Sequence, residues 1–185
     1  MGAMKAVAIY SEELLEAAVR YVDFGWSVIP IVGNKRPMVA WSEYMRRRPI
    51  QAELEAWFSW ENAERLEGIA VICGPVSENL TIRDFDSLAA YRRWVASHPA
   101  ESLSLPTVRT ARGYHVYFTS DHGRVEKLGD GELRGGRGYC LLPPSRHPSG
   151  AIYEWVNEPA WDALIPAGNP MEFDGRQEAD RLPRT

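Results

Sequence analysis

The sequence predicts an α+β protein in which helices and strands alternate early and strands dominate late. Three observations lead to this class. Amphipathic segments with helical spacing fall before residue 100, β-rich segments separated by turn residues fill positions 106–155, and no internal repeat is present. Strands that follow one another through short turns favour antiparallel pairing. We therefore expect an antiparallel or mixed sheet with a few covering helices.

The first half is predicted to alternate between helix and strand. One helix follows Ser11, its expected N-cap, as far as Gly25, and another covers residues 49–60. The segment "WSVIPIVG" is a strand that Pro30 marks as an edge strand or as one with an irregular exit. The apolar run "GIAVICG" is typical of an interior strand. A third strand, "TIRDFD", leads into a helix over residues 87–98.

The second half is predicted to be mainly strand. "PTVRTARGYHVYFTS" contains two strands joined by a loop at residues 111–113, and "GYCLLPPSRHPSGAIYEW" contains two more around a loop rich in Pro, Ser and Gly. "GDGELRGGRGY" alone is typical of a flexible exposed turn. Residues 169–185 have little periodicity, so we expect a folded domain over residues 1–168 and a C-terminal tail or linker.

The composition is that of a soluble globular protein. The chain has 185 residues, of which 45% are hydrophobic and 25% charged, and the two cysteines, Cys73 and Cys140, lie in apolar runs typical of buried thiols. No segment has the roughly 18 apolar residues that span a membrane. The start lacks the pattern of a secretory signal, so we expect a cytoplasmic protein without a membrane partner.

The charge is unevenly distributed. The net charge is -4, yet residues 92–146 carry nine basic and five acidic side chains. This excess is compatible with a local site for a polyanion or a triphosphate, and equally with a scattered solvated surface.

Two carboxylates close the strand "TIRDFD". Alternation along a strand places Asp84 and Asp86 on one face, roughly 7 Å apart. At an effective dielectric of about 20 they repel by about 2 kcal/mol, which a cation between them would relieve. The alternative is structural: Asp86 or Ser87 caps the next helix, and Asp84 is solvated.

Several basic and polar residues could bind phosphate. Gly113 allows close backbone approach, Arg112 adds a fixed charge, and His115 follows on the strand, although a single histidine there is often only a surface or core residue. Other candidates lie in "GNKRP", "GDGELRGGRGY" and "PPSRHPSG". They are Lys35, Arg134, Ser145, Arg146 and His147, whereas Asp130 and Glu132 in the second of these segments could add a third carboxylate.

The order of these segments closely resembles the bifunctional primase-polymerase (prim-pol) domain of the archaeo-eukaryotic primase superfamily. The resemblance extends from about Leu14 to Trp155 and includes "DFGWSVIPI", "NKRPMVAW", "GIAVICGP", "TIRDFDS", "TVRTARGYHVYF" and "ELRGGRGYCLLPPSRHPSGAIYEW". Such domains occur in replication proteins of plasmids, phages and other mobile elements. The resemblance implies an RRM-like sheet with an added small αβ lobe.

The resemblance also implies roles for particular residues. Asp84 and Asp86 match the family's acid pair and would be metal ligands, and Glu132 would be the third acid, with Asp130 as the alternative. His115 would be catalytic and contact the phosphates of the incoming nucleotide. Where many members carry serine, this chain has Gly113. The remaining nucleotide-pocket residues would be Lys35, Arg112, Arg134, Ser145, Arg146 and His147.

The implied activity is that of a DNA primase or DNA polymerase. Two divalent ions, Mg²⁺ or Mn²⁺, would assist attack of a 3′-hydroxyl on the α-phosphate of a dNTP or NTP. The implied partners are a single-stranded DNA template, a primer and a helicase domain or protein. Two alternatives stay open: a non-catalytic nucleic-acid-binding module of the same fold, and a metal-dependent transferase or hydrolase that uses Asp84 and Asp86.

Overall fold

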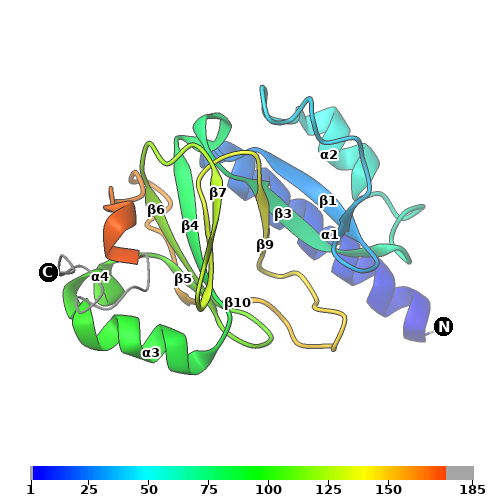
Figure 1. Cartoon of the computed structure of the whole chain (residues 1–185). Coiled ribbons are helices and arrows are strands. Elements are labelled where there is room, and N and C mark those ends of the chain that lie inside the picture. The colour runs from blue at the N-terminus through cyan, green and yellow to red at the C-terminus, as the bar shows by residue number, and fades with distance from the viewer. Residues whose placement is uncertain (1, 174–185) are drawn as a thin grey trace, which may run out of the picture.

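Two antiparallel sheets form the centre of the computed structural model, which describes residues 2–173 (Figure 1). The helices are α1 (Gly2–Asp23), α2 (Gln51–Trp57), α3 (Leu88–Ser97) and α4 (Pro99–Ser104), with short 3₁₀ turns η1 (Pro75–Ser77) and η2 (Pro170–Phe173). The strands are β1 (Val28–Val32), β2 (Arg36–Pro37), β3 (Leu66–Ile72), β4 (Leu80–Phe85), β5 (Thr107–Arg109), β6 (Tyr114–Thr119), β7 (Val125–Leu128), β8 (Gly131–Arg134), β9 (Tyr139–Leu142) and β10 (Glu154–Asn157).

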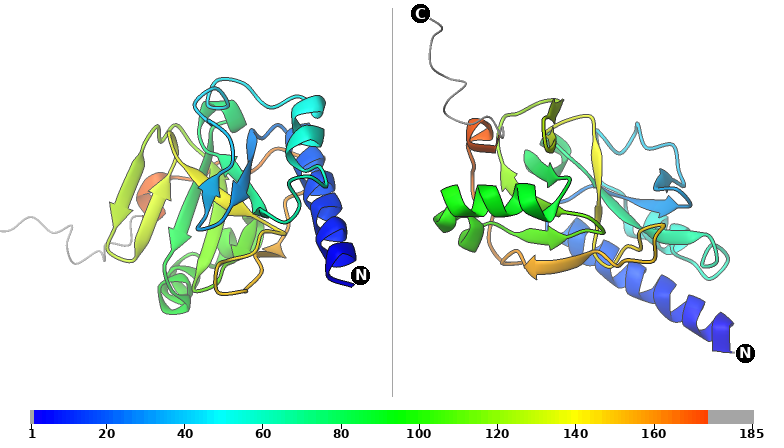
Figure 2. Two further views of the ribbon diagram at one scale, coloured as in Figure 1. Left: turned by 90° about the vertical axis from the view of Figure 1, so that its right-hand side faces the viewer. Right: turned by 60° about the horizontal axis from the view of Figure 1, so that its bottom comes forward.

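The small sheet has the strand order β2-β1-β3-β9. It is predominantly apolar because β1 and β3 are buried along nearly their whole length. Helices α1 and α2 lie on its side of the molecule (Figures 1 and 2). The register of β1 against β3 shifts after Ile31, which is the irregular exit expected next to Pro30.

The large sheet has the strand order β10-β5-β6-β4-β8-β7, and all its pairings are antiparallel. Alternation along β4 sends Ile82 and Asp84 toward the small sheet, whereas Arg83 and Phe85 lie on the face covered by α3. One hydrophobic core therefore lies between the sheets and beneath α1 and α2, and a second lies between the large sheet, α3 and η2.

The predicted α+β class and antiparallel pairing are confirmed. Ser87 caps α3 as expected, since its hydroxyl accepts a hydrogen bond from the N–H of Ala90 at 3.2 Å. Both cysteines are buried free thiols. Between residues 2 and 173 no helix combines the length and the apolar character that crossing a membrane requires.

Three expectations about the elements differ from the structure. Helix α1 begins at Gly2, so Ser11 is not an N-cap; its hydroxyl donates to the carbonyl of Ala8 at 3.0 Å within the helix. The glycine-rich segment is not a free turn, because β8 pairs with both β4 and β7.

The third difference concerns the C-terminal segment. The predicted tail starts at residue 169, yet Phe173 is 1% exposed and its ring stacks on Phe118 at 4.2 Å between centroids. Arg83 Nε also donates to the carbonyl of Phe173 at 2.8 Å. Residues 170–173 are therefore packed on the large sheet, and residues 174–185 of the predicted tail lie outside the described residues.

Candidate active site

Three neighbouring strands bring two acids and a histidine into one row. In the register of β4 with β6 and β8, Asp84 lies directly opposite His115 on one side and Glu132 on the other. Residues that are directly opposite in antiparallel strands share a face, with Cβ atoms about 4.5–5.5 Å apart. The row Glu132, Asp84, His115 thus crosses the face of the large sheet that is turned toward the small sheet.

Basic side chains contact both acids of this row. His115 Nε2 lies 3.4 Å from Asp84 Oδ1, and an Arg134 nitrogen lies 3.7 Å from Asp84 Oδ2. The same guanidinium lies 2.5 Å from a carboxylate oxygen of Glu132. Arg134 therefore bridges the two carboxylates and lowers the cost of holding them side by side.

The ionisation of the row follows from burial and these partners. Burial would raise the pKa of Asp84, but His115, Arg134 and Arg83 outweigh it and lower that pKa to about 2. Burial would lower the pKa of His115, but Asp84 outweighs burial and raises it above 6.5. The contact between Asp84 and His115 thus favours an ion pair of an aspartate with a protonated histidine.

A polar pocket of about 60 Å³ opens beside this ion pair. It collects seven of the residues singled out in the sequence: Lys35, Asp84, Asp86, Arg112, Gly113, His115 and His147. Phe85, Thr110, Ala111 and Tyr153 complete the lining. Asp86 lies just beyond the end of β4, and its N–H donates to the carbonyl of Asp130 at 3.0 Å. Both predicted acids therefore line the same pocket.

The basic lining residues influence one another. Burial lowers the pKa of Lys35, an effect that Asp84 opposes and that Arg112 and Arg134 reinforce. Burial, Lys35 and Arg112 also lower the pKa of His147, so this imidazole is neutral near pH 7. The pocket consequently combines acids on β4 with cations from the loops around it.

Glycine at position 113 is required by a close backbone approach. A Cβ atom built on Gly113 would lie 1.7 Å from the carbonyl oxygen of Phe85 and 2.9 Å from the backbone nitrogen of Ser87. Both distances are far below van der Waals contact. Serine, which is frequent in the family at this position, therefore does not fit this backbone, and no side-chain hydroxyl contact is available here.

Two other predicted residues lie away from the pocket. The Ser145 hydroxyl is fully buried, donates to the carbonyl of Ile69 at 2.9 Å and accepts from the N–H of Ile69 at 2.8 Å. It fixes its loop to β3. The guanidinium of Arg146 lies over the ring of Tyr10 in α1, 3.7 Å from the centroid.

Asp130 has a structural partner. Its carboxylate forms an ion pair with the fully buried Arg83, and the second oxygen lies 3.5 Å from an Arg93 nitrogen. Arg83 also lies over the ring of Phe85, on the face of the sheet opposite Asp84. Of the two candidates for the third acid, Glu132 is the one next to Asp84.

Tyr153 is a site residue that was not expected. It is 4% exposed, its ring lies 5.9 Å from that of His115, and its hydroxyl has no hydrogen bond within residues 2–173. Burial first, and then Asp84, raises the pKa of Tyr153 to about 12, so the hydroxyl stays a donor. No local pattern marks it, because only the folding back of the loop before β10 brings it to the pocket.

The carboxylates fit a hard divalent cation. Within residues 2–173 no group of three or more His, Cys, Asp or Glu side chains is close enough to hold a metal by itself. Mg²⁺, however, is commonly bound by one or two carboxylates together with substrate phosphates. Asp84 and Asp86 supply two such carboxylates in one pocket, next to basic side chains that suit phosphate.

The fold and its site define a class: an α+β protein whose antiparallel sheet presents acids and cations suited to metal-assisted phosphate chemistry. A family model described as bifunctional DNA primase/polymerase, N-terminal, matches residues 18–172, and the chain belongs to this family. The family implies nucleotidyltransferase activity on DNA and nucleotides, with divalent metals. No curated protein matches the chain.

Proposed function

We propose that the polar pocket around Asp84 catalyses template-directed nucleotidyl transfer, as a DNA primase, a DNA polymerase or both. The observation that carries the proposal is the position of Asp84. It lies between His115 and Glu132 on adjacent strands and shares a pocket with Asp86. Acidic and basic groups at one place suit a reaction in which a 3′-hydroxyl attacks the α-phosphate of a nucleoside triphosphate and pyrophosphate leaves.

The acids would hold the metal ions. Asp84 and Asp86 supply carboxylates to two divalent ions, with Glu132 as the third acid. When bound, Mg²⁺ or Mn²⁺ would lower the pKa of the attacking 3′-hydroxyl and neutralise charge on the leaving pyrophosphate. Because its pKa is about 2, Asp84 is ionised at neutral pH. Its negative charge is therefore available to a divalent cation.

The basic residues would bind the triphosphate. Asp84 favours the protonated form of His115, and Lys35 and Arg112 line the same pocket. Fixed cations at the phosphates orient the α-phosphate for in-line attack and stabilise charge in the transition state. Gly113 keeps the β5–β6 loop close to the end of β4, which brings Arg112 near the acids.

The partners follow from the reaction. The proposed substrates are a dNTP or NTP, a single-stranded DNA template and a primer, and a helicase domain or protein is the proposed further partner. Template contacts would be made to the backbone and by stacking on bases, since a polymerase accepts every sequence. A cytoplasmic setting and a role in mobile-element replication belong to the same proposal.

A nucleotide-incorporation assay tests the activity. The protein is incubated with primed and unprimed single-stranded templates, labelled dNTPs or NTPs, and Mg²⁺ or Mn²⁺. Product on either template supports nucleotidyl transfer, and product on the unprimed template assigns priming. Asp84→Asn should reduce the rate at least 100-fold without loss of folding. The absence of product in every combination would contradict the proposal.

A matched pair of variants tests the third acid. Glu132→Gln should reduce incorporation by at least tenfold at an unchanged melting temperature. Asp130→Ala should instead lower stability by about 3–5 kcal/mol, because it leaves the buried Arg83 without its counter-charge. The opposite result, with activity lost at full stability in Asp130→Ala and retained in Glu132→Gln, would assign the role to Asp130.

A further inference from the structure

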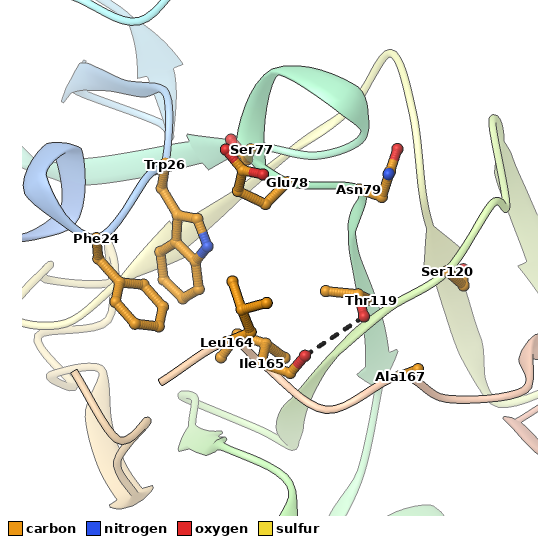
Figure 3. Close-up of a pocket in the computed structure, with 10 residues that line it drawn as sticks. All are labelled: Phe24, Trp26, Ser77, Glu78, Asn79, Thr119, Ser120, Leu164, Ile165 and Ala167. Atoms are coloured by element: carbon orange, nitrogen blue, oxygen red, sulfur yellow. Dashed lines mark hydrogen bonds between the residues drawn. The ribbon is translucent and has the colours of Figure 1, made fainter. Parts of the chain in front are cut away.

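A second pocket lies at the opposite end of β4 and β6 from the acid pair. Its volume is about 290 Å³, just below the roughly 300–1,000 Å³ typical of small-molecule sites (Figure 3). Asn79, which precedes β4, and Thr119, which ends β6, line it. Asn79 is five residues from Asp84, or about 16 Å along a strand, so the two pockets are separate.

An N–H group that has no hydrogen-bond partner within residues 2–173 faces this pocket. Trp26 is 1% exposed, and its ring stacks on Tyr21 at 5.7 Å and on Tyr117 at 5.9 Å. Both faces of the indole are thus covered, and its edge lines the cavity. Figure 3 shows the indole nitrogen on the edge turned toward Thr119. It has no hydrogen bond within residues 2–173, so it is free to donate to an acceptor on a ligand.

The rest of the lining limits the chemistry of the ligand. Phe24, Leu164 and Ile165 make the walls largely apolar, and Glu78 supplies a carboxylate whose partner is Arg48 at 3.2 Å. None of the ten lining residues carries a positive charge, so the cavity itself cannot retain a phosphate. The lining suits a flat, uncharged group with apolar faces, an acceptor for Trp26 and an amino group near Glu78.

We infer that this cavity binds a nucleobase, with any attached phosphate remaining outside. A base has apolar faces and a polar edge that combines acceptors with amino groups, which matches this lining. Membership of a primase/polymerase family makes nucleotides and DNA available as sources. The base can belong to a free nucleoside or to a single-stranded DNA. The inference concerns binding at a second site and does not require the proposed catalytic roles.

The indole N–H resonance of Trp26, assigned by triple-resonance NMR, provides the test. Adenosine, a dA-containing oligonucleotide, the same oligonucleotide with abasic sites, and toluene are titrated separately without metal. We expect a saturable shift with adenosine, with the oligonucleotide or with both, and none with the abasic strand. A response to adenosine alone assigns a free nucleoside, and a response to the oligonucleotide alone assigns a strand. No shift with either, or an equal shift with toluene, overturns the inference.

Three variants test whether the shift of the Trp26 resonance arises from binding in this cavity. Ala167→Trp adds a large side chain to the lining and should weaken the binding measured at Trp26 at least tenfold, whereas Ala163→Trp, an exposed change in the same segment that does not line the cavity, should not. Asp84→Asn should leave the shift intact, which separates this site from catalysis. An unchanged response in Ala167→Trp, or its loss in Asp84→Asn, contradicts a nucleobase in this cavity.

Discussion

At the residue scale, the ion pair between Asp84 and His115 defines the state of the candidate site. Each residue shifts the other's pKa in the direction that preserves the pair, although burial acts against both charges. The pKa of the aspartate falls from 3.8 to about 2, and that of the histidine rises above 6.5. The pair therefore contributes its full stability between pH 3.8 and pH 6.5, the ordinary pKa values of an aspartate and a histidine. It is lost as the pH rises through the raised pKa of His115, or falls through about 2.

The pH dependence of His115 is the first prediction. Followed by NMR of its ring without divalent metal, the pKa of His115 should lie above 6.5 in the unaltered protein. In Asp84→Asn it should fall below 6.5, because burial then acts without the aspartate. An unchanged pKa in the variant would mean that Asp84 does not hold the proton on His115.

The Tyr153 hydroxyl gives a second prediction. Since this group has no hydrogen bond within residues 2–173, Tyr153→Phe should change stability by less than about 0.5 kcal/mol. It should raise KM for the nucleotide several-fold in steady-state incorporation if the hydroxyl donates to bound substrate. Tyr114→Phe is the matched control, because Tyr114 stacks on Tyr91 of α3 outside the pocket. Equal effects of the two changes would remove Tyr153 from the site.

At the element scale, the chain before β6 passes close to the end of β4 because residue 113 has no side chain. The register of β4 with β6 pairs Phe85 with Tyr114, so the preceding residue must pass close to the end of β4. Gly113 is the residue that makes this passage. The same contact positions Arg112 and His115, and the geometry of the site therefore depends on one glycine.

Replacing this glycine is the third prediction. Gly113→Ser should destabilise the protein by about 3 kcal/mol or more, since its Cβ would overlap the carbonyl of Phe85. Gly129→Ser is the control, because a Cβ at Gly129 meets no atom within 4 Å. Urea unfolding of both variants gives the measurement. Equal midpoints for the two serine variants would show that the β5–β6 loop relaxes without cost.

At the scale of the whole molecule, the C-terminal segment completes the second core. Phe173 packs on Phe118 of β6 and on Trp94 of α3, and its carbonyl accepts from Arg83. The buried guanidinium behind β4 is thus satisfied by Asp130 and by the backbone of η2. The segment that looked like a linker stabilises the strand that carries Asp84.

The fourth prediction concerns truncation of the Phe173 side chain. Phe173→Ala should lower the free energy of unfolding by about 3–5 kcal/mol, the usual cost of removing a buried aromatic ring. Leu103→Ala removes a side chain that is 82% exposed and should change stability by less than about 0.5 kcal/mol. Calorimetry compares the two. A similar melting temperature for both would mean that Phe173 is not part of the core.

The local sequence determined the elements with strong patterns and the residues that matched family motifs. The helices predicted at residues 49–60 and 87–98 and the strands predicted around Ile69 and Ile82 are present as α2, α3, β3 and β4, and Ser87, one of the two predicted caps, caps α3. These features depend on neighbouring residues, so a linear pattern records them.

Tertiary structure decided which of the candidates meet. Asp84 and Glu132 are 48 positions apart, and only the pairing of β8 with β4 places them side by side, in a segment whose glycines indicated a free turn. The fold likewise placed Tyr153 in the pocket, bound Ser145 to Ile69 and paired Asp130 with Arg83. Strand register and side-chain partners are set by contacts between distant segments, and no local spacing encodes them.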